Sequence, residues 1–363
     1  MLSTTCTERL GPLGRLAGPS PQALVLGMHR SGTSALTSLL DRMGFHAGPD
    51  ESLMPADGHN ARGYWELGEL QAFNEKLLSA LGASWTDVLD LDPRRLNETA
   101  RARFRERARL FINHLDSYGP WVIKDPRLCL LLPIWLEMLD RPVCILIHRH
   151  PLAVARSLSR RNGLPTLVGI ALWEKYNLAA LEYSRGLPRA LVSYRDLVDN
   201  PAGAAAQLVR SLRSSGVQGI DALRHLSPED ARTLLDSSLE HHVPSPEEDL
   251  GYLNDRQRDL LGSLESGSAL VYPVPPLSAG AREVLLEHVR QARERRATIQ
   301  TLTERIQRIE ETLEHKRQAA EEREALLSAV FSSRSWRLGF GLTRLFRRRE
   351  LSAFDRWKSL SDP

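Results

Sequence analysis

Short apolar runs, each closed by turn-forming or charged residues, recur along the first two thirds of the chain. A helical spacing of apolar residues follows the first run, over residues 35–43, and similar patterns follow the others. Continuous apolar runs of this length are typical of buried parallel strands, and strands that alternate with helices predict a parallel α/β sheet flanked by helices. The four runs are Ala23–Leu26, Trp121–Ile123, Val143–Ile147 and Ala190–Ser193.

A polar or charged cluster follows the carboxyl end of each predicted strand. These clusters are Gly27–Ser34, Lys124–Arg127, His148–Pro151 and Tyr194–Leu197. In a parallel sheet, ligands bind in the crevice beyond the carboxyl ends of the strands. We therefore expect the functional site to combine residues from these four clusters.

The hydrophobic pattern changes after about residue 240. Residues 272–280 are rich in proline, which predicts a stiff linker between a domain over residues 23–271 and the C-terminal segments. Over residues 281–330 an apolar residue recurs at every seventh position, and the second position of each heptad is mixed. This repeat predicts a coiled coil and a homo-oligomer; a long single helix packed on a domain is the alternative. The apolar positions are Leu285, Ala292, Ile299, Ile306, Leu313, Ala320 and Leu327.

The last segment, residues 331–363, begins with a basic and amphipathic stretch. Residues 331–349 hold six arginines and no acid, interleaved with large apolar side chains such as Trp336. Such a stretch is typical of a helix that lies on an anionic membrane surface. A solvated tail is the alternative, and a nucleic-acid patch lacks an accompanying fold motif.

Composition excludes other classes of protein. The 363 residues are 42% hydrophobic and 26% charged, and the net charge of +3 is too small to indicate nucleic acid. Three cysteines without a close pair fit neither a disulfide framework nor a zinc site, and buried thiols suit a reducing compartment. Residues 1–22 predict a flexible lead without a signal core, and the longest apolar run, 128–139, is too short to span a bilayer. We expect a cytoplasmic protein, with the inner face of the cell membrane as a candidate location.

The loop Gly27–Ser34 has the chemistry of an anion site. Its glycines let backbone N–H groups converge, and the following helix dipole favours negative charge. The spacing from Gly27 to Gly32 matches that of nucleotide triphosphate loops, but Thr33 stands where those loops carry lysine. The cation is instead Arg30. This difference favours a metal-free anion site over a magnesium–nucleotide enzyme.

Two motifs resemble those of sulfotransferases that use 3′-phosphoadenosine 5′-phosphosulfate (PAPS). Arg30–Ser34 after a strand resembles their 5′-phosphosulfate loop. The segment 145–157 resembles their 3′-phosphate motif, in which an arginine ends a strand and a serine follows eight residues later; Arg149 and Ser157 match. A guanidinium and a hydroxyl at this spacing can grip one phosphate.

The resemblance extends over roughly residues 22–260. The segment 192–201 resembles a later family element and implies that Tyr194 lies near the adenine or the phosphate. The family usually has an acid at the position of Arg195 and an aspartate at that of His150. The resemblance implies that PAPS is the sulfuryl donor, that no metal takes part, and that the fold is P-loop-like. The implied donor-binding residues are His29, Arg30, Ser31, Gly32, Thr33, Ser34, Arg149, Ser157 and Tyr194.

Three residues are candidates for the chemistry. Lys124 resembles a family lysine that faces the bridging oxygen of the donor, with a surface lysine as the alternative. Glu66, in an element like the N-x-x-G-Y-x-E of bacterial relatives, is the favoured base. Asp125, which precedes a proline, is either a helix cap, which the Asp-Pro junction favours, or a further candidate for the base. The rival bases are Asp50, Glu51 and His59.

The residues and the resemblance together imply a sulfotransferase that acts on a carbohydrate hydroxyl of a cell-surface polysaccharide or glycolipid. Tyr64, Trp65 and Trp85 are candidate platforms for a sugar ring. The segment Ser333–Leu338 resembles a tail found on bacterial surface-polysaccharide enzymes. The alternative functions are a P-loop small-molecule kinase and a non-catalytic nucleotide-binding scaffold built on a coiled coil.

Overall fold

Four short strands pair in parallel and form one sheet in the order β2-β1-β3-β4. A computed structural model of the chain describes residues 20–55, 63–227, 229–230 and 251–346. Each predicted apolar run is a strand, and the predicted parallel α/β sheet is confirmed. The strands are β1 Gln22–Leu26, β2 Trp121–Lys124, β3 Pro142–His148 and β4 Arg189–Ser193.

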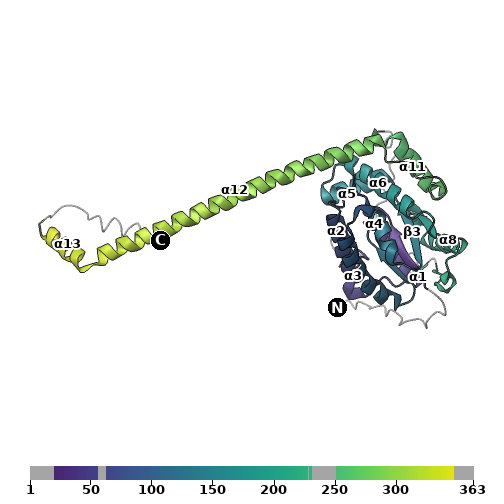
Figure 1. The fold of residues 1–363 in the computed structure, drawn as a ribbon, viewed down its shortest axis with the longest axis horizontal. Coiled ribbons are helices and arrows are strands. Elements are labelled where there is room, and N and C mark those ends of the chain that lie inside the picture. Colours follow the sequence, from purple (N-terminus) through teal and green to yellow (C-terminus); the bar gives the residue numbers. More distant parts are fainter. Residues whose placement is uncertain (1–19, 56–62, 228, 231–250, 347–363) are drawn as a thin grey trace. The chain divides into compact units, whose positions relative to one another are not determined.

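Helices cover the sheet (Figure 1), because alternate strand residues face opposite sides. On β1, Leu24 and Leu26 join one apolar cluster, while Ala23 and Val25 join another. The first cluster contains side chains of α2 to α6 and α11, and the second contains side chains of α1, α7 and α8. The helices are α1 Thr33–Met43, α2 Gly68–Ala80, α3 Glu98–Asp116, α4 Leu128–Trp135, α5 Pro151–Asn162, α6 Thr166–Tyr183, α7 Tyr194–Asp199, α8 Pro201–Ser214, α11 Asp255–Glu265, α12 Ala279–Ser332 and α13 Arg334–Phe346.

The register brings the carboxyl ends of the strands to one edge. Val25 lies beside both Lys124 and Ile145, and His148 lies beside Ser193. The loop after β1 is therefore next to the last residues of β2 and β3, as the sequence predicts. The thiols of Cys129 and Cys144 are buried and unpaired, also as predicted, and burial raises the pKa of Cys144 to about 12.

The first compact unit ends at Arg290, beyond the predicted domain boundary at residue 271. Ala281, Leu285 and Val289, on the first turns of α12, are buried in it. The predicted linker 272–280 is also anchored. Buried Glu174 accepts hydrogen bonds from the backbone N–H of Ser278 (2.6 Å), the Ser278 hydroxyl (2.8 Å) and the Gln257 side chain (2.8 Å). A buried carboxylate needs such donors, so residues 272–280 are packed as part of the first unit.

The second unit comprises residues 291–363 and is described up to residue 346. Its described part consists of the remainder of α12 together with α13. No helix among the described residues of either unit combines the length and the hydrophobicity that crossing a membrane requires.

Replacing Leu285 by alanine should lower the free energy of unfolding of the first unit by about 2–5 kcal/mol, because a fully buried leucine leaves a cavity. Leu286, the next residue on the same helix, is 59% exposed, and Leu286→Ala should change stability by less than about 0.5 kcal/mol. Urea denaturation of both full-length variants makes the comparison. Equal, small effects would show that α12 does not stabilise this unit.

Candidate active site

The loop between β1 and α1 is shaped by close packing. Arg30 and Gly32 both have left-handed backbone conformations, with φ of 68° and 90°. A Cβ on Gly32 would lie 2.1 Å from Cδ2 of Tyr194, and one on Gly27 would lie 2.7 Å from Cγ2 of Ile147. Only glycine fits such approaches. Gly27 and Gly32 are therefore needed because side chains at the end of β3 and just after β4 leave no room for a Cβ at either position.

This loop presents hydrogen-bond donors with no side-chain partner. Helix α1 begins after Gly32 without a side-chain cap and without an acid in its first turn. The hydroxyl of Ser31 is buried and has no hydrogen-bond partner. Buried hydroxyls are normally satisfied, and the amino end of a helix attracts anions. The loop therefore has the donors to bind an anion.

A buried ion pair lies beside the loop. Lys124, the last residue of β2, is only 2% exposed. Its Nζ donates to Oε1 of Glu66 at 2.5 Å and to the Ser34 hydroxyl at 3.3 Å. Burial lowers the pKa of Lys124 below its usual value, while the charge of Glu66 opposes this shift. These contacts exclude the surface-lysine alternative for Lys124.

The segment that carries Glu66 is bent sharply towards Lys124. Gly63 and Trp65 have φ of 81° and 52°, and a left-handed tryptophan is uncommon enough to mark a functional constraint. The backbone oxygen of Glu66 accepts a hydrogen bond from the N–H of Met54 (2.8 Å), which anchors the bend. The Ser34 hydroxyl donates to the backbone oxygen of Tyr64 (3.0 Å) and ties this segment to the loop.

Two of the rival candidates for the base are exposed, unlike the buried Glu66. Asp50 and Glu51 are exposed on a short 3₁₀ helix, Asp50–Ser52. His59 lies outside the described residues. Among the described candidates, Glu66 is the carboxylate that pairs with Lys124.

Asp125 forms its contacts within the turn that precedes α4. Its fully buried carboxylate accepts from the backbone N–H of Arg127 at 2.7 Å and from the Arg127 guanidinium at 3.1 Å. Burial raises the pKa of Asp125 and Arg127 opposes this shift. Arg127 also donates to Glu75 (3.0 Å), a partner that sequence reasoning missed. Helix α4 begins at Leu128 with Arg127 as its N-cap residue and without a side-chain cap, so Asp125 orders the turn before the helix, and its predicted roles stay predictions.

The predicted phosphate-binding residues converge from separate segments. Nε of Arg30 donates to the Ser157 hydroxyl at 2.9 Å, and Arg149 donates to the backbone oxygen of Arg30 at 3.2 Å. The Arg149 guanidinium lies 4.4 Å from the ring centroid of Tyr194. Desolvation lowers the pKa of Arg30 and of Arg149, yet guanidinium groups remain charged in proteins. His150 caps α5 by accepting from the Leu152 N–H (3.3 Å), so it replaces a capping aspartate.

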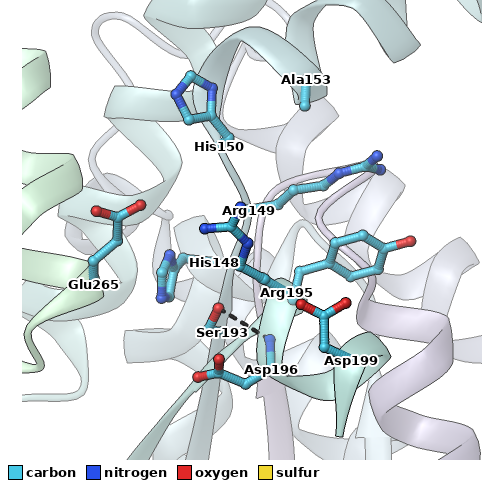
Figure 2. A pocket seen from close by; sticks show the side chains of 10 residues that line it. His148, Arg149, His150, Ala153, Ser193, Arg195, Asp196, Asp199 and Glu265 are labelled. Atoms are coloured by element: carbon cyan, nitrogen blue, oxygen red, sulfur yellow. Dashed lines mark hydrogen bonds between the residues drawn. The ribbon is translucent and has the colours of Figure 1, made fainter. Parts of the chain in front are cut away.

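A pocket of about 510 Å³ opens beside Arg149 at the carboxyl ends of β3 and β4 (Figure 2). The sequence places His148 in the cluster that follows the third predicted strand, but it did not identify Glu265 as a lining residue. Burial lowers the pKa of His148 to about 4, so its ring is neutral at pH 7. The lining residues are His148, Arg149, His150, Ala153, Ser193, Tyr194, Arg195, Asp196, Asp199 and Glu265.

Aromatic side chains lie on the other side of the loop. The ring centroids of His29 and Trp85 are 4.8 Å apart, and Nε2 of His29 is buried without a hydrogen-bond partner. Burial and nearby Arg127 lower the pKa of His29, which is therefore neutral. Arg161 donates to the Tyr64 hydroxyl at 2.8 Å. Sequence reasoning missed Arg161, although its spacing of four residues from Ser157 on α5 places both on one helix face.

The chain is similar to three solved sulfotransferase structures, each with a TM-score of 0.34 or 0.35. A sulfotransferase domain from the curacin biosynthetic pathway is 18% identical to this chain. The match covers 76% of this chain and 98% of the chain of that domain, with a TM-score of 0.34. One from the Synechococcus PCC 7002 olefin synthase is also 18% identical, covers 75% and 95%, and has a TM-score of 0.35. Sulfotransferase STF9 from Mycobacterium avium is 13% identical and covers 72% and 79%, with a TM-score of 0.34.

A search of curated proteins finds no match. The model of the sulfotransferase family matches residues 21–215, which is more than half of the 363 residues. The matched region contains the loop, the Lys124–Glu66 pair and the cluster around Arg149. The chain belongs to the sulfotransferase family.

Proposed function

We propose that the protein transfers a sulfuryl group from PAPS to a hydroxyl of a carbohydrate, in a cell-surface polysaccharide or a glycolipid. The observation that carries the proposal is the buried Lys124–Glu66 pair, which lies against a loop whose Ser31 hydroxyl is buried without a hydrogen-bond partner among the described residues. A cation and a carboxylate at one anion site can serve the leaving group and the attacking hydroxyl, respectively.

The donor fits the residues that the strand ends bring together. The buried Ser31 hydroxyl and the amino end of α1 suit the 5′-phosphosulfate. Arg30, Arg149 and Ser157 form a connected set that suits the 3′-phosphate. The pocket of about 510 Å³ beside Tyr194 has room for a nucleoside.

Each residue of the pair has one role in the proposed reaction. The donor supplies the sulfuryl group, whose bond to the bridging phosphate oxygen breaks as the acceptor oxygen bonds to sulfur. Glu66 accepts the proton that the acceptor hydroxyl loses. The ammonium of Lys124, which is paired with Glu66, balances the negative charge that develops on the leaving phosphate.

A carbohydrate acceptor is supported by the surroundings of Glu66. Trp85 is half-buried and packs against neutral His29, and Tyr64 precedes Glu66 by two residues. Aromatic faces next to hydrogen-bonding side chains suit a ring that is apolar on its faces and polar at its rim. The resemblance of the Ser333–Leu338 segment to tails of bacterial surface-polysaccharide enzymes also supports a carbohydrate acceptor.

The alternative functions have less support. A P-loop kinase needs a lysine at the position of Thr33 to reach the terminal phosphates of its nucleotide. A non-catalytic scaffold has no need to keep Lys124 buried at the cost of desolvation, whereas a charge-stabilising site does.

We also propose that the tail binds an anionic membrane surface at the inner face of the cell membrane. In α13, Trp336 and Leu338 are 42% and 68% exposed, and Arg334 and Arg337 are exposed with them. Exposed basic and large apolar side chains on one helix suit such a surface. Three further arginines of the stretch, Arg347, Arg348 and Arg349, lie outside the described residues.

Adenosine 3′,5′-bisphosphate should stabilise the protein in a thermal-shift assay without added metal, because it carries both phosphates that the site is proposed to bind. At 100 times its dissociation constant, a ligand adds about 2.7 kcal/mol of stability. Arg149→Ala should remove most of this effect. Stabilisation by magnesium ATP, with none by the bisphosphate, would overturn the donor assignment.

Glu66→Gln should reduce the transfer of ³⁵S from labelled PAPS to a glycan extract by about 10²–10³-fold, as loss of a general base does. The amide oxygen that this substitution introduces still accepts a hydrogen bond from Lys124, so the variant should fold and still bind the bisphosphate. Glu51→Gln is the matched control and should keep near-normal activity. The opposite pattern of losses would make Glu51 the base.

The tail proposal predicts that the full-length protein floats with vesicles containing anionic lipid and not with neutral ones. Arg334→Ser with Arg337→Ser should weaken this binding, since each arginine near such a surface contributes about 1 kcal/mol, and the difference should shrink as salt rises. Arg308→Ser, on α12, is the control. Flotation that ignores lipid charge would contradict the proposal.

A further inference from the structure

We propose that the part of α12 beyond Arg290 pairs with the same segment of a second copy of the chain in a parallel, two-stranded coiled coil. This part of the helix has a row of large apolar side chains that are more than half exposed. Such a row on a protein surface marks an interface. Its exposed fractions are Ile299 63%, Leu302 51%, Ile306 56%, Ile309 51% and Leu313 61%.

The spacing of this row is that of a coiled coil. Successive members are separated alternately by three and four residues, which is the a and d pattern of a heptad. The first turns of α12 carry on the sequence repeat, but Leu285 is fully buried in the first unit. The available seam therefore begins only at Ile299, later than the sequence repeat alone indicates.

On the opposite face of the helix, polar side chains form hydrogen bonds with each other within one chain. Gln300 donates to Glu304 at 3.2 Å, and Gln307 donates to Glu311 at 3.4 Å. These residues occupy the b and f positions, which point away from an a and d seam. The apolar row is thus the face that is left for a partner.

Charge complementarity identifies the partner as a second copy. With Ile299, Ile306 and Leu313 at position a, Arg305 is at position g and Glu310 is at position e of the next heptad. In a parallel pair, position g of one helix faces that position e of the other. Arg305 of one copy then meets Glu310 of the other, and the symmetry repeats the pair.

Neither side chain of this pair forms a salt bridge or hydrogen bond in the described chain. An antiparallel arrangement would bring g to g and e to e, so that Arg305 and Glu310 would not meet. The complementarity therefore favours parallel helices. Lys316 and Arg323 interrupt the d positions before Val330 resumes them, which weakens the association and disfavours shifted registers.

Sedimentation equilibrium of the full-length protein tests the pairing. We expect twice the mass of one chain at micromolar concentration, and the mass of one chain for the Ile306→Lys and Ile309→Lys variants. Gln307→Lys adds the same charge at position b and should leave the dimer intact. Unchanged thermal unfolding of the first unit shows that the variants are folded. A monomeric or trimeric wild-type chain, or a dimer insensitive to Ile306→Lys and Ile309→Lys, would overturn the proposal.

Charge reversal tests the direction of the helices. Arg305→Glu and Glu310→Arg should each weaken dimerisation several-fold, and the double variant should restore it, because reversal of both charges recreates the pair. In a Cys6→Ser background, Ile309→Cys should form an interchain disulfide under mild oxidation, whereas Gln307→Cys should not. Single variants without effect, or failure of Ile309→Cys to crosslink, would refute the parallel arrangement. This test is independent of the proposed enzymatic activity.

Discussion

A lysine ammonium that is almost completely removed from water must have a counter-charge, and Lys124 obtains it from Glu66. This requirement explains the left-handed backbone at Gly63 and Trp65, which turns the chain so that Glu66 reaches the end of β2. It also links the loop after β1 to the segment that carries Glu66, because Ser34 contacts both Lys124 and Tyr64. Truncation of either side chain would leave the other charge buried without its ion-pair partner.

The second group of cations is arranged by different means. Arg149 has a carbonyl oxygen and an aromatic ring as its partners rather than a carboxylate. Its backbone oxygen accepts from the indole of Trp173 at 2.9 Å, which anchors the residue itself. A guanidinium that is held in place but not neutralised keeps its charge available to an anion. The site thus combines one cation that is paired with a carboxylate, Lys124, with another that is not, Arg149.

Helix α12 shows how one periodic pattern serves two purposes. The same heptad spacing contains Leu285, which is buried in the first unit, and Ile306, which is 56% exposed. Glu174 fixes the point of entry by holding Ser278 just before the helix. Because burial removes the first apolar positions from the surface, only the later ones remain for a partner.

The sequence by itself determined the order of strands and helices, the anion loop and the positions of Arg149 and Ser157. Apolar runs, glycine spacing and strand-end charges are local features, and parallel topology brings strand ends together. Only the tertiary structure distinguished Glu66 from Asp50 and Glu51, paired Arg127 with Glu75, and moved the domain boundary to Arg290. Each of these outcomes depends on contacts between residues far apart in the chain. The burial and charge of such partners are set by packing, which no local pattern contains.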